Sequence, residues 1–274
     1  MKKNDLIDLM TSLGLRATKT RGQNFLLDEG VLTQIAQAAQ IIPGERLIEV
    51  GPGFGTLTDS LLAQNAPVTT IELDRGLAGY LRQKYADRPE LELIEGDALE
   101  LLPAQFARYP GARFVANIPY NITTPILEIL CQTTPPPQTV ILTVQKELAE
   151  RLSAKPRTKA YGAMTVMIQW RFRVEYLFTL KGAQFFPAPD VDSAVIRLSP
   201  SDHAGQIAAE DHKAFDRLVR TGFSQRRKML RKILPQITPK DIEATLSALG
   251  LNPLARAEEL GLEDWFKLFN KLKE

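Results

Sequence analysis

The fold of this chain is decided at residues 49–56, which read EVGPGFGT. A short β-prone run, 46–50, ends at these glycines, and a helical pattern, 56–63, follows directly. Glycines in a turn between a strand and a helix let the backbone approach a ligand closely, and the N-terminus of the helix offers free N–H groups. We therefore predict the first strand–turn–helix unit of an α/β domain, with a binding site at the turn.

The segments around this turn alternate between strand and helix patterns from about residue 30 to 150. The predicted strands are 46–50, 68–72, 91–95, 113–117 and 139–144, and the predicted helices include 31–39, 56–63 and 75–85. This alternation is typical of βαβ units and of a mostly parallel sheet covered on both faces. Residues 171–178 and 193–198 have strand patterns with no helix between them, so we expect an antiparallel hairpin at one edge of the sheet.

The chain changes character near residue 203. Residues 199–205, SPSDHAG, have the composition of a linker, and only helical patterns follow. One expected helix begins with Thr238 as its cap and Pro239 in its first position and ends at Gly250, and the last covers 263–272. We expect an α/β domain over residues 1–203 and a small helical domain over 204–274.

The overall composition is that of a soluble globular protein. The 274 residues are 44% hydrophobic and 24% charged, with a net charge of +2. No apolar run approaches the roughly 20 residues that span a bilayer, and no apolar core follows Met1 as in a secretory signal. A single cysteine, Cys131, forms no internal disulfide and suggests no metal site. These features favour a cytoplasmic protein without a metal and, since no oligomerisation signal is present, a monomer.

Two acids mark the ends of the next two strands. Glu72 lies 21 residues after Gly51, where a carboxylate can accept hydrogen bonds from both hydroxyls of a ribose. Asp97 follows the third strand, where it can accept from the amine of an adenine. Ligands bind at the carboxyl ends of strands in open α/β sheets, so the glycine turn and the two acids together predict a nucleoside site.

The glycine spacing narrows the choice of nucleoside. A dinucleotide fingerprint requires a third glycine at the sixth position, which here is Thr56, and no phosphate-binding GxxxxGK[ST] loop is present. The turn resembles instead the first motif of the class I S-adenosylmethionine methyltransferases, in which an acid, here Glu49, helps to orient the methionine end of the cofactor. That resemblance implies S-adenosyl-L-methionine as cofactor.

The fourth strand is followed by Asn117-Ile118-Pro119-Tyr120. The exocyclic nitrogen of adenine is a poor nucleophile because its lone pair is delocalised into the ring. A side-chain carbonyl from Asn117 and a backbone carbonyl from Ile118, both accepting from that amine, would localise the lone pair. Pro119 fixes the turn, and Tyr120 offers a ring on which the base can stack. Taken alone the tetrapeptide is an ordinary Asn-X-Pro turn, but it resembles the [DNS]-P-P-Y motif of amino methyltransferases, and isoleucine in second place is typical of those acting on ribosomal RNA.

Four stretches together resemble the bacterial ribosomal RNA small-subunit (16S) adenine dimethyltransferases. They are 19–26, 49–58 with Glu72 and Asp97, 117–120, and 185–195, which reads FFPAPDVDSAV. The resemblance implies a class I, Rossmann-like fold and dimethylation of two adjacent adenosines near the 3′ end of 16S ribosomal RNA in the assembling small subunit. It assigns Asn24 and Leu26 to the cofactor site and Phe186 to the face of the target base opposite Tyr120.

The predicted site has two parts. The cofactor-binding residues are Asn24, Leu26, Glu49, Gly51, Gly53, Gly55, Glu72, Asp97, Ala98 and Asn117. The catalytic residues are Asn117, Ile118, Pro119, Tyr120 and Phe186.

A basic cluster in the helical tail suggests contact with RNA. Seven cations fall within residues 217–232 beside a single acid, Asp216, and the apolar stripe of the same segment turns most of them outward. Phosphate contact is the expected use of such a surface. The predicted RNA-binding residues are Arg220, Arg226, Arg227, Lys228 and Arg231, with Arg16, Lys19 and Arg21 as a second group.

Three alternatives remain open. A 23S ribosomal RNA adenine methyltransferase of the macrolide-resistance type would share the core, although the Phe186 loop and residues 226–228 favour the small-subunit type. A largely non-catalytic assembly factor could keep the fold, but residues 117–120 are intact. A nicotinamide oxidoreductase is disfavoured by Thr56.

Overall fold

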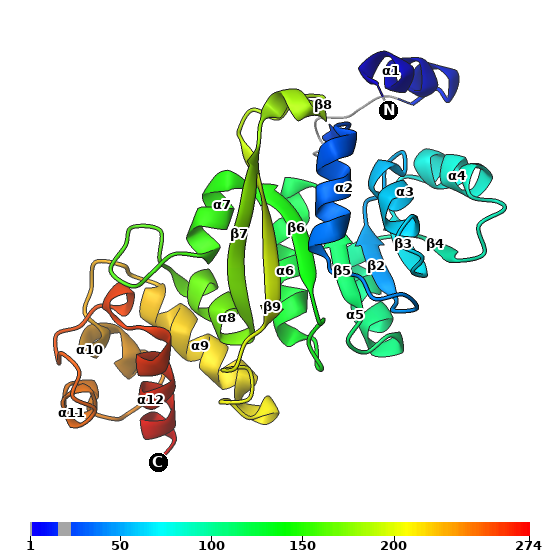
Figure 1. Ribbon diagram of the computed structural model, residues 1–274. Helices are drawn as coiled ribbons and strands as arrows, with labels where there is room; N and C mark the ends of the chain where they lie inside the picture. The colour runs from blue at the N-terminus through cyan, green and yellow to red at the C-terminus, as the bar shows by residue number, and fades with distance from the viewer. Residues whose placement is uncertain (1, 16–22) are drawn as a thin grey trace. The chain divides into compact units, whose positions relative to one another are not determined.

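A seven-stranded sheet is the centre of the first part of the chain in the computed structural model, which describes residues 2–15 and 23–274 (Figure 1). Parallel pairing joins five neighbouring strands, and β9 runs antiparallel to the last of them, with β7 at the edge. This confirms the predicted mostly parallel sheet with an antiparallel edge. In sheet order the strands are β4 (Leu91–Glu95), β3 (Val68–Glu72), β2 (Leu47–Val50), β5 (Arg113–Ala116), β6 (Val140–Gln145), β9 (Ser193–Pro200) and β7 (Phe172–Leu180).

Helices cover both faces of the sheet because the strands are apolar on both sides. Val115 packs in one cluster with residues of α2, α3 and α4, whereas the ring of its neighbour Phe114 meets Phe106 of α5 at a centroid distance of 5.8 Å. Successive strand side chains point to opposite faces, so each of these two residues serves a different layer. The helices of this part are α2 (Glu29–Ala38), α3 (Thr56–Leu62), α4 (Arg75–Lys84), α5 (Ala98–Arg108) and α6 (Thr123–Gln132).

The strand order places the candidate site. β2 lies between β3 and β5. After β2 the chain adds β3 and β4 on one side of it, and then returns to add β5 and β6 on the other side. A crevice opens at such a switch point, at the carboxyl ends of the strands. Leu47 is paired with Arg113 and Ile48 with Phe114, and the same register continued beyond both strands sets Gly51 beside Asn117.

The N-terminal segment adds structure that the sequence analysis did not predict. Helix α1 (Lys3–Ser12) packs Leu6 and Met10 into a small apolar cluster with Phe54 and Leu77. Beside it, β1 (Phe25–Leu26) and β8 (Phe185–Phe186) form a two-stranded antiparallel sheet. Phe54 of the Gly-rich turn therefore packs in a cluster with apolar residues of α1, and Phe25 and Phe186 of the two short strands pack against the same cluster.

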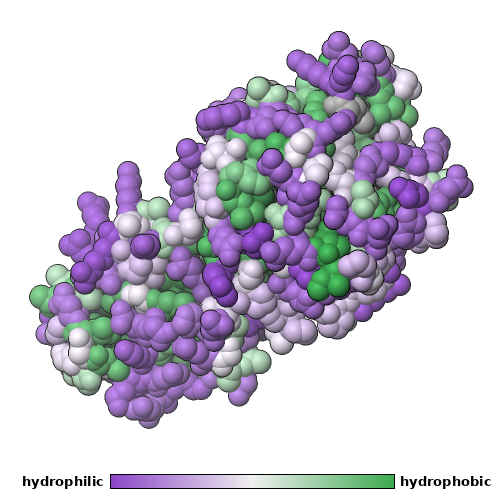
Figure 2. All heavy atoms as spheres, viewed as in Figure 1, coloured by the Kyte–Doolittle hydropathy of each residue, from purple (hydrophilic) through white to green (hydrophobic). Residues whose placement is uncertain are grey.

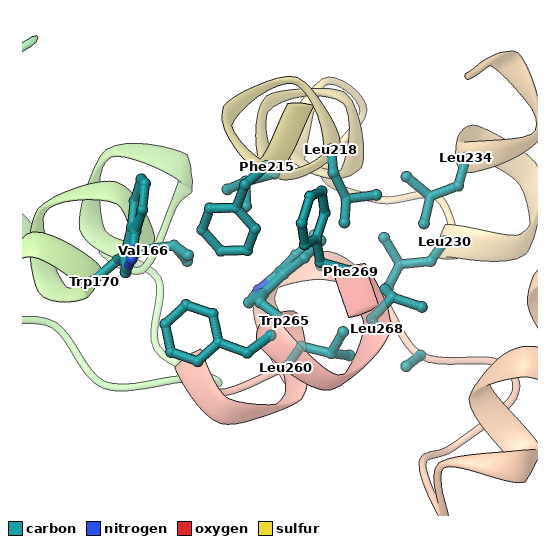
Figure 3. Close-up of a cluster of buried hydrophobic side chains, with 14 of the residues drawn as sticks. Val166, Trp170, Phe215, Leu218, Leu230, Leu234, Leu260, Trp265, Leu268 and Phe269 are labelled. Carbon is teal, nitrogen blue, oxygen red and sulfur yellow. The ribbon is translucent and has the colours of Figure 1, made fainter. Parts of the chain in front are cut away.

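The chain divides into two compact units, but not at the predicted boundary. The first comprises Met1–Ala149 and Glu175–Pro200, and the second Glu150–Val174 and Ser201–Glu274. The expected division into 1–203 and 204–274 assigned residues 150–174 to the wrong unit. The reason is packing: Val166 and Trp170 of α8 (Ala163–Arg171) lie in the core of the second unit, where the Trp170 ring meets Phe215 at 5.0 Å (Figure 3).

The second unit is mainly helical, apart from the first residues of β7, and one of its helices begins later than predicted. Its further helices are α9 (His212–Phe223), α10 (Leu230–Ile233), α11 (Ile242–Ala248) and α12 (Leu262–Lys273), and α7 (Lys146–Leu152) spans the division between the units. Asp241, not Thr238, caps α11, since its side chain accepts a hydrogen bond from the Ala244 N–H and residues 234–236 still belong to the preceding 3₁₀ turn. Gly250 follows α11 with a φ of +71°, as expected of a helix end.

None of the helices in the described residues is long and apolar enough to cross a membrane.

Candidate active site

A hollow lies at the carboxyl ends of β2, β3 and β5. Its walls come from the turn after β2, from Glu72, and from the tetrapeptide 117–120, with the segment 23–26 lying across them. Ten of the predicted site residues line it: Asn24, Leu26, Glu49, Gly51, Gly53, Glu72, Asn117, Ile118, Pro119 and Tyr120. The structure thus brings together residues that are up to 96 positions apart in the sequence. The parallel strand order explains this for the residues that follow β2, β3 and β5, whereas Asn24 and Leu26 lie at the separate β1–β8 pair.

The glycine turn has a shape that only glycines allow. Gly51 and Gly53 have φ values of +66° and +59°, and a Cβ on Gly53 would lie 2.8 Å from Cε1 of Phe25. The far side of the turn is fixed by two side chains that the sequence analysis missed. Tyr85 donates to the Gly55 carbonyl at 2.9 Å, and Lys84 donates to the Phe54 carbonyl at 3.0 Å. The turn is consequently a rigid, backbone-lined floor for a ligand.

Glu72 links the turn to the end of β3. The Glu72 carboxylate accepts from the Gly53 N–H at 3.2 Å and from the Asp74 N–H at 2.8 Å. Burial raises its pKa, while these backbone hydrogen bonds act in the opposite direction. Each carboxylate oxygen can accept a second hydrogen bond, so Glu72 can hold the turn and still receive ribose hydroxyls.

Glu49 is a buried acid at the base of the hollow. Only 1% of it is exposed, and the Thr58 hydroxyl donates to Oε2 at 2.7 Å. Burial raises the pKa of the Glu49 carboxyl to about 8, despite the Thr58 hydrogen bond, and the nearby charges of Asp59 and Glu72 add to the effect. In the cofactor-free protein, Glu49 is therefore largely protonated at neutral pH.

This raised pKa predicts a pH-dependent stability. Glu49 takes up protons more readily in the folded chain (pKa about 8) than in the unfolded chain (4.5), so the free energy of unfolding should fall as pH rises from about 4.5 to 8. The full decline would be of the order of 5 kcal/mol at most. Urea unfolding of the cofactor-free protein at several pH values should show a flatter profile for Glu49→Gln. Parallel profiles for the variant and the wild type would contradict the prediction.

Three of the predicted cofactor residues do not line the hollow: Gly55, Asp97 and Ala98. Asp97 is exposed beyond β4 and caps α5 by accepting from the Leu99 N–H at 2.8 Å, so its contact with an adenine amine stays a prediction. Leu73, which the sequence analysis passed over, is 62% exposed directly after Glu72. Leu73 does not line the hollow either.

Asn117 has a fixed orientation. Its Nδ2 donates to the Asn24 backbone carbonyl at 3.1 Å, so the amide nitrogen faces the protein and Oδ1 faces the hollow. The assignment of nitrogen and oxygen follows from the partner, because a carbonyl accepts only from N–H. In the described residues, no donor engages the Ile118 carbonyl. Two acceptor oxygens are thereby available at one place.

Tyr120 is held by a residue outside the tetrapeptide. Its hydroxyl lies 2.5 Å from Oγ of Ser193, which is fully buried at the start of β9. Burial raises the pKa of Tyr120, so it is a neutral phenol at physiological pH. Ser193 belongs to the stretch 185–195 that carried the family resemblance, but its role was not predicted. The hydrogen bond limits rotation of the ring on which a base would stack.

We expect Ser193→Ala to lower kcat about tenfold, because a freely rotating Tyr120 ring positions the base less well. Cofactor affinity should not change, since Ser193 does not line the hollow at the ends of β2, β3 and β5. Tyr120→Phe removes the other half of the hydrogen bond, so the double variant should cost no more than either single one. Strictly additive losses in single-turnover rates would show that the two hydroxyls do not act together.

A second hollow adjoins the first. It is lined by Gln145 and the loop 187–191, and it shares Gln23, Asn24 and Tyr120 with the first hollow. A ligand in the first hollow and a base in the second would therefore meet beside Asn24 and Tyr120, and Asn117 lies next to them in the wall of the first hollow.

Phe186 lines neither hollow. Its pairing opposite Phe25 directs it to the apolar cluster under α1, where the Lys3 ammonium lies 5.3 Å from the ring centroid, and Phe185 is buried in the main core. The contact of Phe186 with a target base stays a prediction.

The basic cluster is more extensively paired than its sequence indicates. Arg220 pairs with Asp216 at 2.8 Å, Arg226 with Glu258 at 2.6 Å and Arg231 with Glu243 at 2.5 Å. The interpretation that a single acid accompanies the cluster was wrong, because folding brings acids from later helices. Arg217, Arg227, Lys228 and Lys232 are exposed and form no ion pair within the described residues. The predicted contacts Arg16, Lys19 and Arg21 lie outside the described residues.

A family model and a curated relative both match this chain over most of its length. The model of the family described as "Ribosomal RNA adenine dimethylase" matches residues 14–274. A curated relative from Synechocystis sp., "Ribosomal RNA small subunit methyltransferase A", is 44% identical over an alignment covering 95% of this chain and 98% of that protein.

Two solved structures are similar over almost the whole chain. The 23S rRNA methyltransferase ErmE is 30% identical with a TM-score of 0.70, over 92% of this chain and 100% of that one. A dimethyladenosine transferase from Plasmodium falciparum is 26% identical with a TM-score of 0.75, over 91% and 98%. The methyltransferase fold is thereby shown for the chain.

Proposed function

Because this chain belongs to the ribosomal RNA adenine dimethylase family, we propose that it methylates the exocyclic amines of two adjacent adenosines near the 3′ end of 16S ribosomal RNA. The methyl donor is S-adenosylmethionine, and the products are N(6),N(6)-dimethyladenosines. We propose the small ribosomal subunit or its precursor, in the cytoplasm, as the substrate. Such an enzyme would act during small-subunit biogenesis.

The observation that carries this proposal is the fixed amide of Asn117, which lines the first hollow and is hydrogen-bonded to Asn24, a residue shared with the second hollow. Asn117 Oδ1 and the Ile118 carbonyl can both accept from an adenine amine, which favours a tetrahedral nitrogen with a localised lone pair. Tyr120, tethered to Ser193, supplies the ring against which the base is held. Contacts within the protein hold both side chains in position, so catalysis can consist mainly of positioning and electrostatics.

The residues of the first hollow fit the methyl donor. The glycine floor leaves room for backbone contact, Glu72 retains acceptor capacity for ribose hydroxyls, and Leu26 and Leu77 supply apolar walls. S-adenosylmethionine supplies a methyl group on a sulfonium, which is an excellent leaving group. A cationic ligand end near Glu49 would favour the ionised carboxylate and so offset its burial. No metal or covalent enzyme intermediate is needed for this chemistry.

The test is incubation of the protein with isotope-labelled S-adenosylmethionine and ribosomal subunits that lack the modification. Mass spectrometry of digested 16S and 23S ribosomal RNA should find two labelled methyl groups on each of two adjacent adenosines near the 3′ end of 16S ribosomal RNA. Label in 23S ribosomal RNA would instead support the function named for ErmE. Binding to the subunit without any label would support a non-catalytic assembly factor.

A further inference from the structure

A clamp in the second unit holds the loop between α7 and α8, residues 153–162. Arg226 pairs with the Glu258 carboxylate at 2.6 Å and also donates to the Thr158 carbonyl at 3.2 Å. The Glu258 backbone carbonyl accepts from the Arg157 N–H at 2.7 Å. Glu258 and Arg226 thus contact the middle of the loop on two successive residues, although Arg226 lies 68 positions from Thr158 in the sequence.

The clamped loop is basic and exposed. Lys155, Arg157 and Lys159 alternate along it, all three are exposed, and residues 151–161 contain no acid. Arg157 has a φ of +68°, a left-handed conformation that a non-glycine residue adopts only under constraint from its surroundings. Over this loop, the green segment between α7 and α8 in Figure 1, the surface in Figure 2 is mainly hydrophilic.

The clamp joins this loop to the predicted RNA-binding segment. Arg227 and Lys228 follow Arg226 directly and are exposed without ion pairs in the described chain. Lys155, Arg157, Lys159, Arg227 and Lys228 are therefore exposed cations on two segments that the clamp joins, and we call them together the clamped basic surface. Of the neighbouring acids, Glu258 is engaged by Arg226, and Glu259 accepts from the Arg256 N–H.

We propose that the loop 155–159 is a second RNA-phosphate-binding segment, and that the Arg226–Glu258 pair positions it beside Arg227 and Lys228. The proposal rests on the proposed function, which supplies ribosomal RNA as the partner. Five cations with few acids suit a polyanionic backbone. A loop that is already ordered loses less conformational entropy when RNA binds. Arg226 would therefore favour RNA binding by holding the loop, even though its own charge is paired with Glu258.

The first test compares two charge-matched double variants. Lys155→Gln/Lys159→Gln removes two loop cations, and Lys213→Gln/Lys267→Gln removes two exposed, unpaired lysines elsewhere in the same unit. Binding to small subunits lacking the modification is measured across a salt series. For the loop variant, the slope of log K against log salt should become shallower by about 1 to 2, and the control should keep the wild-type slope. Equal slopes for the two double variants would overturn the proposal.

The second test distinguishes the effect of the Arg226–Glu258 ion pair on RNA binding from the effect of net charge. Glu258→Gln raises the net charge by one, so charge alone would tighten RNA binding. Loss of the ion pair with Arg226 should instead loosen the loop and weaken binding several-fold, with unchanged S-adenosylmethionine affinity. Tighter binding would refute the clamp. If the wild-type protein neither binds nor methylates small subunits, the proposed function itself fails, whereas normal methylation with equal slopes refutes only the role of the loop.

Discussion

Asn117→Ala is expected to reduce methyl transfer by about 10³-fold or more while S-adenosylmethionine still binds. The substitution removes Oδ1, one of the two acceptors for the adenine amine, and the hydrogen bond to the Asn24 carbonyl that orients it. A factor of 10³ corresponds to about 4 kcal/mol of transition-state stabilisation, in the range for losing one preorganised polar group from an active site. Because the lost contact matters most when the nitrogen becomes tetrahedral, kcat should fall far more than KM rises.

The matched control is Asn121→Ala, which makes the same chemical change four residues away at an exposed position. Single-turnover transfer of labelled methyl groups to small subunits measures the chemistry, and calorimetry measures cofactor binding. Asn117→Asp gives a further comparison, because it keeps oxygen acceptors but loses the N–H that faces the Asn24 carbonyl, so it should remain severely impaired. Full turnover by Asn117→Ala would refute the proposed mechanism.

Glu72→Gln is expected to weaken S-adenosylmethionine binding by roughly 100-fold, or about 2.7 kcal/mol. The carboxylate accepts two backbone hydrogen bonds and has capacity for ribose hydroxyls. The two backbone N–H groups donate to different carboxylate oxygens, and a glutamine amide has only one oxygen, so its NH₂ group would face one of these N–H donors. Buried donors left facing one another are costly, and the cost should appear in cofactor affinity and in the order of the glycine turn.

Glu95→Gln is the control, since it neutralises an exposed acid at the end of the neighbouring strand that pairs with Arg82 at 2.7 Å outside the hollow. Calorimetric titration of both variants should show a loss of affinity only for Glu72→Gln. If its affinity equals that of the wild type while thermal stability falls, Glu72 serves only to hold the turn.

Much of the fold could be predicted because its signals are local. Strands 68–72 and 91–95 were predicted with the bounds that the structure has, and the strand patterns, the glycines and the helix end at Gly250 each depend on a few neighbouring residues. The boundary prediction failed because α8 has a pattern that suits either unit. Only the packing of Trp170 against Phe215 assigns it to the second.

The candidate site likewise contains residues that the sequence could predict and residues that it could not. Glu49, Gly51, Glu72 and residues 117–120 could be located because parallel strands bring their carboxyl ends to one edge. Ser193 and Tyr85 could not, since each acts on a partner in another element. The ion pairs of Arg226 and Arg231 were also invisible, because their acids lie 32 and 12 positions away.

By itself, the sequence determined the α/β class, the glycine-rich turn after β2 and the tetrapeptide 117–120, because backbone propensity, hydrophobic period and turn chemistry act over a few residues. The tertiary structure alone decided how those parts are oriented. The Asn117 amide is turned by a carbonyl 93 positions away, Tyr120 is tethered by a hydroxyl 73 positions away, and the basic loop is held by Glu258. Hydrogen bonds of this kind depend on distances set by packing of the whole chain, and no local pattern encodes them.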